Sequence, residues 1–200
     1  MGCLWGMFVG DALAMPVHWY YDRSRIKQDF GKITKYEAPM ASFPESIMNK
    51  SSTGGGGRGS TQGSIIGDVI CHGKKDYWHS SKGYHYHHGM RAGDNTLDTL
   101  ICRLLLVSMA QNAGLFSSPH FLKSYATFMT TPDSHNDVYA ATAHRMFFAN
   151  YQKKIPLNQC ADNDGHNTDS IDGLINTIPL AIKQALQGGP KTQTHEVINA

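Results

Sequence analysis

Apolar residues recur at helical spacing in several separate stretches of this sequence, and this pattern restricts the fold to helices more than any other feature. The clearest stretch spans residues 97–111 and is apolar at Leu97, Leu100, Ile101, Leu104, Leu105 and Met109. Spacings of three and four residues place these side chains on one face of a helix. Strand and helix patterns do not alternate along the chain, so the sequence predicts an all-α fold.

The same pattern predicts helices in four other regions. These are 2–15, 118–130, 137–152 and 169–187. Pro16 ends the first region, because a proline ring clashes with the preceding helical turn. Pro179 divides the last region into two helices, the second with Thr177 as its N-cap. A chain of 200 residues suits a single domain, which we expect to span 1–200.

The first predicted helix has two unusual features. Gly2, Gly6 and Gly10 share one of its faces. Each glycine costs a helix about 1 kcal/mol relative to alanine, so their repetition predicts close approach by another helix. Asp11 interrupts an otherwise apolar segment, and a buried carboxylate needs a charged partner, a metal or a hydrogen-bond network.

Two segments between the predicted helices have a distinctive composition. Residues 51–64 read SSTGGGGRGSTQGS, which is typical of a flexible loop. A phosphate-binding loop is excluded because no Gly-Lys-Ser/Thr follows and no strand pattern precedes it. Residues 76–88, which are rich in aromatic residues and histidine, admit an edge strand or a hairpin.

Composition narrows the classes of partner and location. The formal net charge is +2 and no Lys/Arg-rich run occurs, so a nucleic-acid surface is not indicated. No apolar stretch reaches the roughly 18–20 residues of a membrane span, and the N-terminus lacks the basic segment of a signal peptide. The four cysteines are widely spaced, which favours free thiols in a reducing cytoplasm.

Three short polar clusters lie at the ends of predicted helices. They are Gly10-Asp11, Gly93-Asp94-Asn95-Thr96 and Asn167-Thr168-Asp169-Ser170. Carboxylate, amide and hydroxyl oxygens are the ligands that Mg²⁺ takes in proteins. Each cluster by itself is more typical of a helix N-cap, so spacing alone leaves both interpretations open.

The motifs GMFVGDALAMPVHW, GDNTLDT and NTDSIDGL occur in the order seen in the ADP-ribosylglycohydrolase family. That family includes the dinitrogenase-reductase-activating glycohydrolases and related jellyfish crystallins. The motifs of this chain look closest to those of the crystallin-like subgroup. The resemblance covers residues 1–19 and 85–187. It implies an orthogonal multi-helix bundle, an Mg²⁺ or Mn²⁺ site, and hydrolysis of an N- or O-glycosidic bond to ADP-ribose.

The resemblance also implies a set of metal ligands. Family members hold their metals with a Thr-Asp-Asp-Thr and a later Asp-x-Asp-Thr motif, and two clusters of this chain align with them. Asp94 and Asp169 match carboxylate ligands, and the supporting positions are Asn95, Thr96, Asn167 and Ser170. Two amides replace carboxylates, so the site loses two formal negative charges. Affinity is therefore expected to fall, and one ion rather than two is implied.

His18 stands where members of the family usually carry a carboxylate. With an unperturbed pKa close to 6.5, it is either a catalytic base or a sign of altered chemistry. By the same resemblance, Asp94 is a catalytic candidate, and Asp11 is expected to orient the metal loop or the contacts of the first helix.

The histidines near residue 85 allow two interpretations. A zinc site at His85, His87 and His88 is disfavoured because no cysteine or acidic partner lies in phase. We expect instead that His85, His87, Gly93 and His166 line a ligand cleft, although a solvated polar loop is an equally supported alternative.

Two functions follow from the resemblance. The first is an ADP-ribosylglycohydrolase-like enzyme with a weakened metal site, acting on an ADP-ribosylated substrate. The second is a non-catalytic ADP-ribose-binding or crystallin-like structural protein on the same scaffold. Family members continue with further helices after the second motif, so one interpretation is a shortened form that lacks C-terminal helices.

Overall fold

The computed structural model of the chain describes residues 2–43, 65–78, 83–162 and 172–187, and these are helical. The α-helices and 3-10 helices are α1 (Gly2–Ala14), η1 (Met15–Val17), α2 (Arg23–Phe30), α3 (Ile65–Asp68), η4 (Lys75–Trp78), α4 (Leu97–Gln111), α5 (Ser118–Thr130), α6 (Thr142–Gln152), η5 (Leu157–Gln159), α7 (Asp172–Ile175) and α8 (Ile178–Leu186). In these ranges β pairing is limited to two isolated bridges, one of them between Ser42 and Tyr84. The prediction of an all-α fold is confirmed.

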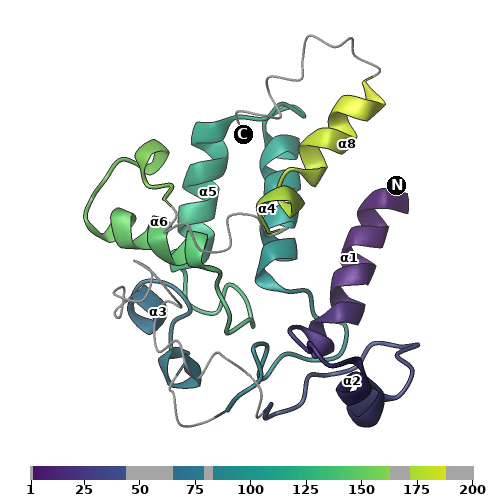
Figure 1. The fold of residues 1–200 in the computed structure, drawn as a ribbon. Coiled ribbons are helices and arrows are strands. Elements are labelled where there is room, and N and C mark those ends of the chain that lie inside the picture. Colours follow the sequence, from purple (N-terminus) through teal and green to yellow (C-terminus); the bar gives the residue numbers. More distant parts are fainter. Residues whose placement is uncertain (1, 44–64, 79–82, 163–171, 188–200) are drawn as a thin grey trace.

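Helix α4 is the centre of the arrangement (Figure 1). It contacts α5 on one side and α1 on the other, and α8 packs along it. The contact with α8 buries Leu105 and Met109 of α4 against Leu180. The N-terminal end of α4 therefore lies beside the C-terminal end of α1, and this junction holds the candidate site.

Aromatic side chains fill much of the main core. Trp78, Tyr86, Phe147 and Phe148 are all buried in one cluster that joins η4, the 83–90 segment and α6. The Nε1–H of Trp78 donates to the carbonyl of Val138 at 2.7 Å, so the largest ring also satisfies a buried backbone group.

Several predicted boundaries are confirmed. Residues 97–111 and 118–130 are the observed spans of α4 and α5. The first helix ends before Pro16, and Thr177 is the N-cap of α8 with Pro179 in its first turn. None of the described helices combines the length and the apolar character that a membrane span requires. The glycine-rich loop predicted at 51–64 lies outside the described residues.

Two expectations are wrong. The helix expected at 137–152 begins at Thr142, because Asp137 accepts hydrogen bonds from other segments and the N-cap Ala141 has an extended backbone conformation. Within the described residues, no helix approaches the glycine face of α1: a Cβ added at Gly2, Gly6 or Gly10 meets nothing within 4 Å.

Candidate functional site

A cavity of about 270 Å³ lies where α1 and η1 meet the N-terminal end of α4 and the end of α7. Apolar residues make up part of its wall, namely Ala14, Met15, Val17 and Ile175. Its polar residues are Asp11, His18, Thr96, Asp98 and Thr99. A mostly apolar pocket with a few convergent polar groups is the usual form of a small-molecule site.

Asp11 connects α1 to the start of α4. One carboxylate oxygen accepts from the Thr96 hydroxyl at 2.7 Å, and the other accepts from the Thr96 backbone N–H at 2.8 Å and the Asn95 amide at 2.9 Å. The Asn95 amide also donates to the carbonyl of Phe8 at 2.7 Å. Asn95 therefore acts as a clamp between the two helices, and Asp11 supplies the capping oxygen that the side chain of Thr96 does not provide.

Asp137 caps the same helix from the segment before α6. It accepts from the backbone N–H of Leu97, the first residue of α4, at 2.8 Å. Its other oxygen accepts from Nδ1 of His87 at 2.8 Å and from the N–H of Tyr139 at 3.1 Å. Burial alone would raise the pKa of Asp137, but His87 and these N–H groups together hold it below its usual value.

A chain of side chains runs from Asp137 to the cavity. Nε2 of His87 lies 2.5 Å from Nδ1 of His18, and His18 lines the cavity wall. His87 is 1% exposed and Asp137 is 1% exposed, so both are shielded from water. Burial, followed by the neighbouring His87, lowers the pKa of His18 to about 3. His18 is thus neutral at neutral pH. It takes up a proton only at a pH well below the range in which a free histidine does.

A second histidine, His144 of α6, contacts a carboxylate of the cavity wall. Nε2 of His144 lies 3.2 Å from Oδ1 of Asp98, and its Nδ1 lies 2.6 Å from the Tyr125 hydroxyl. Tyr125 is fully buried, and burial followed by the charge of Asp98 raises its pKa well above the usual value. The hydroxyl is therefore protonated. Among the described residues, the other oxygen of Asp98 accepts no hydrogen bond.

Trp19 follows His18 in a backbone conformation that L-residues rarely adopt, with φ at 61°. Its ring contacts His18 at a centroid distance of 4.1 Å, Tyr86 at 3.8 Å and Tyr139 at 4.6 Å. These contacts hold one side of the His18 ring against the aromatic core.

The predicted site residues fall into four groups. Asp11, His18 and Thr96 line the cavity, with Asn95 bound to Asp11 beside it. His85 and His87 are buried, at 0% and 1% exposure. The third group, His166, Asn167, Asp169 and Ser170, lies outside the described residues, and Gly93 and Asp94 form the fourth.

Asp94 and Gly93 lie in the turn that precedes α4. Oδ2 of Asp94 accepts from the backbone N–H of Arg91 at 2.9 Å and from the Asn136 amide at 3.3 Å. Gly93 adopts φ of 88°, and its backbone lies against the ring of Tyr36. In this arrangement Asp94 stabilises the turn and is not among the residues that line the cavity.

The cavity offers hard oxygen atoms of the kind that Mg²⁺ binds: the carboxylates of Asp11 and Asp98 and the hydroxyl of Thr96. Asp11 already accepts three hydrogen bonds, whereas Asp98 accepts one from His144. In the part of the chain that the structure describes, no group of three His, Cys, Asp or Glu side chains is arranged to hold a metal. The donor chemistry fits a divalent ion, and a full ligand set needs further oxygens.

The segment after the second predicted metal cluster reaches this cavity. Helix α7 begins at Asp172, two positions after Ser170, and its Ile175 forms part of the wall. The thiol of Cys102 in α4 donates to the carbonyl of Ile175 at 3.2 Å, which holds α7 against α4.

Two site residues escaped sequence analysis. Asp98 lies in the quoted motif GDNTLDT but received no role there, and the helix expected at 137–152 begins at Asp137. Both are carboxylates beside apolar runs. The argument that singled out Asp11, that a carboxylate in apolar surroundings needs a partner, would have found both.

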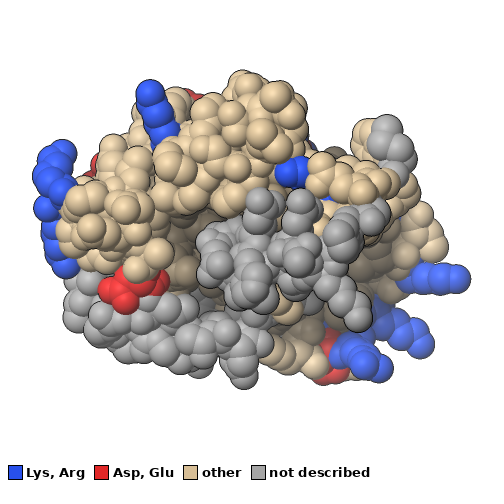
Figure 2. Space-filling model, turned by 90° about the horizontal axis from the view of Figure 1, so that it is seen from above, with Lys and Arg blue, Asp and Glu red and all other residues tan. Residues whose placement is uncertain are grey.

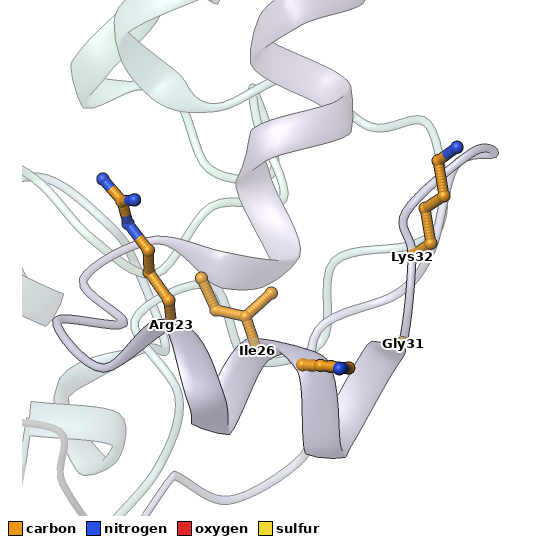
Figure 3. Close-up of a pocket in the computed structure, with 5 residues that line it drawn as sticks. Arg23, Ile26, Gly31 and Lys32 are labelled. Carbon is orange, nitrogen blue, oxygen red and sulfur yellow. The ribbon is translucent and has the colours of Figure 1, made fainter.

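A second hollow, on α2, lacks this chemistry. The shallow depression on α2 is lined by Arg23, Ile26, Lys27, Gly31 and Lys32, and holds neither a carboxylate nor a nucleophile (Figure 3). Its charged side chains are exposed to solvent. Seen from above, Lys and Arg side chains stand in separate groups around the rim of the molecule (Figure 2).

Comparison with known proteins gives one match. The family described as ADP-ribosylglycohydrolase matches residues 1–198. No curated protein and no solved structure matches the chain. The match includes all the residues of the cavity and both histidine-containing chains that lead to it.

Proposed function

The chain belongs to the ADP-ribosylglycohydrolase family, and on this basis we propose that it hydrolyses the glycosidic bond between ADP-ribose and a protein side chain or small acceptor. The observation that supports this most directly is the convergence of Asp11, His18, Thr96 and Asp98 on one cavity at the junction of α1 and α4. Carboxylates, a hydroxyl and a neutral imidazole are groups that bind sugar hydroxyls and a water molecule.

In the proposed reaction, the oxygen of a water molecule bonds to the anomeric carbon while the bond from that carbon to the acceptor nitrogen or oxygen breaks. The acceptor leaves with the bonding electron pair and takes up a proton. Nε2 of His18 is the proposed acceptor for the proton that the water loses. His18 would then pass this proton to the departing acceptor atom, which completes the proton balance of the step.

An Mg²⁺ or Mn²⁺ ion is the expected cofactor. We propose that Asp98 and Thr96 contribute oxygen ligands from the described cavity, and that the set from the resemblance completes the site. Of that set, Asn167, Asp169 and Ser170 would supply the further oxygens, because Asp94 does not line the cavity and the Asn95 amide is bound to Asp11. A bound ion would supply Lewis-acid polarisation of the ribose hydroxyls or of the water.

The test measures release of ADP-ribose by chromatography from ADP-ribosyl-arginine and ADP-ribosyl-serine peptides, with Mg²⁺ present. Wild-type protein should release ADP-ribose, and Asp98→Asn should lower kcat/KM by about 100-fold or more. Asp76→Asn is the matched control, because Asp76 is exposed on η4, away from the cavity. Equal rates for both variants would remove Asp98 from the site.

A non-catalytic protein on the same scaffold is the second candidate. The clamp formed by Asn95, Asp11 and Thr96 favours it, because these groups form hydrogen bonds with one another and not with a ligand. Titration calorimetry with ADP-ribose separates the two candidates. Binding without turnover supports an ADP-ribose-binding protein, and absence of both binding and turnover overturns the enzymatic proposal and supports a crystallin-like structural role.

A further inference from the structure

We propose that Asp137 and His87 are positioning residues that fix His18 as its Nδ1–H tautomer, so that Nε2 of His18 is an unprotonated acceptor at the cavity. This inference rests on the proposed function for its catalytic meaning, whereas the tautomer itself is a property of the free protein. Neither Asp137 nor His87 lines the cavity, so both act through His18.

The direction of the hydrogen bonds follows from Asp137. Its carboxylate accepts from the N–H groups of Leu97 and Tyr139 and lies 2.8 Å from Nδ1 of His87. A carboxylate that accepts from several donors is ionised and can only accept. Nδ1 of His87 must therefore carry the proton that it donates to Asp137.

The protonation of His87 in turn determines which nitrogen of His18 carries a proton. We take His87 to be neutral, with a single ring proton, so donation from Nδ1 leaves its Nε2 as an acceptor. The partner of that nitrogen is Nδ1 of His18, 2.5 Å away, which must then be the donor. Nε2 of His18 is left with a lone pair, and no described residue donates to it. Free histidine in water favours the opposite tautomer, so the protein environment imposes this one.

The hydrogen-bonded series from Asp137 to His18 is held at its buried end by contacts that do not involve either imidazole ring. Lys74 donates to the carbonyl of His135 at 2.7 Å and to that of Asp137 at 2.9 Å. Trp78 donates to the carbonyl of Val138 at 2.7 Å. The backbone on both sides of the Asp137 carboxylate is thus fixed, and this carboxylate keeps a constant direction toward His87.

The position of His87 is fixed in the same way. Its backbone N–H donates to Nδ1 of His85 at 3.0 Å, and its ring stacks against His18. A role in stability alone does not require this arrangement, because well-packed apolar residues usually stabilise a core as much as buried polar partners do. A buried carboxylate that orients an imidazole through its Nδ1–H is the device that selects the tautomer in Ser-His-Asp hydrolases.

Nitrogen-15 NMR of the full-length protein, labelled at histidine, tests the inference without any substrate. Long-range proton–nitrogen correlation distinguishes a protonated ring nitrogen from a bare one, and His18→Gln assigns the His18 signals. The expected result is a protonated Nδ1 and a bare Nε2 for His18 at neutral pH. A protonated Nε2 in the wild-type protein would overturn the inference.

Three variants extend the test. In Asp137→Asn an amide N–H can face Nδ1 of His87, which reverses the tautomers of both histidines. His18 should then be protonated at Nε2, and kcat should fall by about 10³-fold or more. His87→Gln retains an acceptor for His18 and a donor for Asp137, and should keep the wild-type tautomer. His87→Leu offers neither and should release His18 to the tautomer of free histidine. Identical His18 signals in the Gln and Leu variants would contradict a chain that passes through position 87.

The two proposals fail separately. Correct tautomers with no release of ADP-ribose would overturn the hydrolase proposal and leave the positioning chain intact. Release of ADP-ribose by a protein whose His18 is protonated at Nε2 would do the reverse.

Discussion

Asp11 and Asp137 accept hydrogen bonds from two consecutive backbone N–H groups at the start of α4, those of Thr96 and Leu97. Asp11 belongs to α1 and Asp137 to the segment before α6, so carboxylates from distant parts of the sequence cap one helix. Negative charge at a helix N-terminus is stabilising, because the first N–H groups of a helix lack partners within it. The position of the cavity wall therefore depends on both contacts.

We expect Asp11→Ala to lower the free energy of unfolding by about 2–4 kcal/mol, because the Thr96 N–H, the Thr96 hydroxyl and the Asn95 amide lose their acceptor. Urea titration followed by circular dichroism measures the change. Asp76→Ala, on the exposed surface of η4, should stay within about 0.5 kcal/mol of wild type. An unchanged midpoint for Asp11→Ala would mean that water replaces the carboxylate at no cost.

Asp137→Ala should be more destabilising, by about 3–5 kcal/mol, because it leaves His87 and the N–H of Leu97 buried without a partner. The same urea titration measures it. His87→Leu combined with Asp137→Ala removes both members of the pair and should recover part of the loss. If the double variant were no more stable than Asp137→Ala, the unpaired imidazole would not be the source of the destabilisation.

Stability should fall as the pH is lowered from about 6.5 towards 4. Burial is the main cause that lowers the pKa of His18 and His85 to about 3 and that of His135 to about 4. The unfolded chain takes up these protons near pH 6.5, so between about 6.5 and 4 it binds more protons than the folded chain. Each histidine then removes up to about 1.4 kcal/mol per pH unit.

Urea midpoints at pH about 7.5, 6 and 5 check this slope. Asp137 acts in a lower window: its pKa is depressed in the folded state, so its contribution is present above about pH 4 and is lost as the pH falls further. His18→Phe, which cannot be protonated, should flatten the slope between pH 6.5 and 4. A midpoint that does not change over this range would show that these imidazoles are hydrated in the folded protein.

Binding of a divalent ion should be visible without any substrate. We expect millimolar Mg²⁺ or Mn²⁺ to raise the Tm over that measured in EDTA, since a ligand at 100 times its Kd stabilises the folded state by about 2.7 kcal/mol. Asp98→Asn and Asp169→Ala should reduce the shift, whereas Asp76→Asn should not. The same Tm in Mg²⁺ and in EDTA for the wild-type protein would argue against a resident ion.

Thiol reactivity should divide the cysteines sharply. All four are free, as their spacing predicted; Cys3 is exposed, and Cys71, Cys102 and Cys160 are buried. Burial raises the pKa of Cys71 and Cys102 to about 12, so few thiolates form. A thiol reagent should label one cysteine quickly in native protein and all four in denaturant. Rapid labelling of Cys102 would show that α7 detaches from α4.

Local patterns were sufficient to predict the elements whose ends are set within the chain nearby. The spans of α4 and α5 follow from apolar spacing and from Pro119 in the first turn of α5. The start of α6 could not be predicted this way. The partners of Asp137 lie 40 and 50 residues away, at Leu97 and His87, and no local signal reports contacts at such separations.

The candidate site was predicted in part for the same reason. The apolar surroundings of Asp11 indicated that it needs a partner, and the structure supplies three donors. The histidine-rich segment was expected to face a ligand, but its period-two spacing says nothing about which side is enclosed. His87 instead connects two groups that neither local spacing nor family motifs relate, His18 and Asp137.

The conformation of Trp19 sets two requirements in conflict. At φ of 61°, glycine would relieve the main chain, but it would remove the ring that packs on His18 and Tyr86. A large aromatic residue meets the second requirement and violates the first. We therefore expect that a replacement of Trp19 either relaxes the main chain or keeps the His18 ring packed in place. No standard amino acid does both.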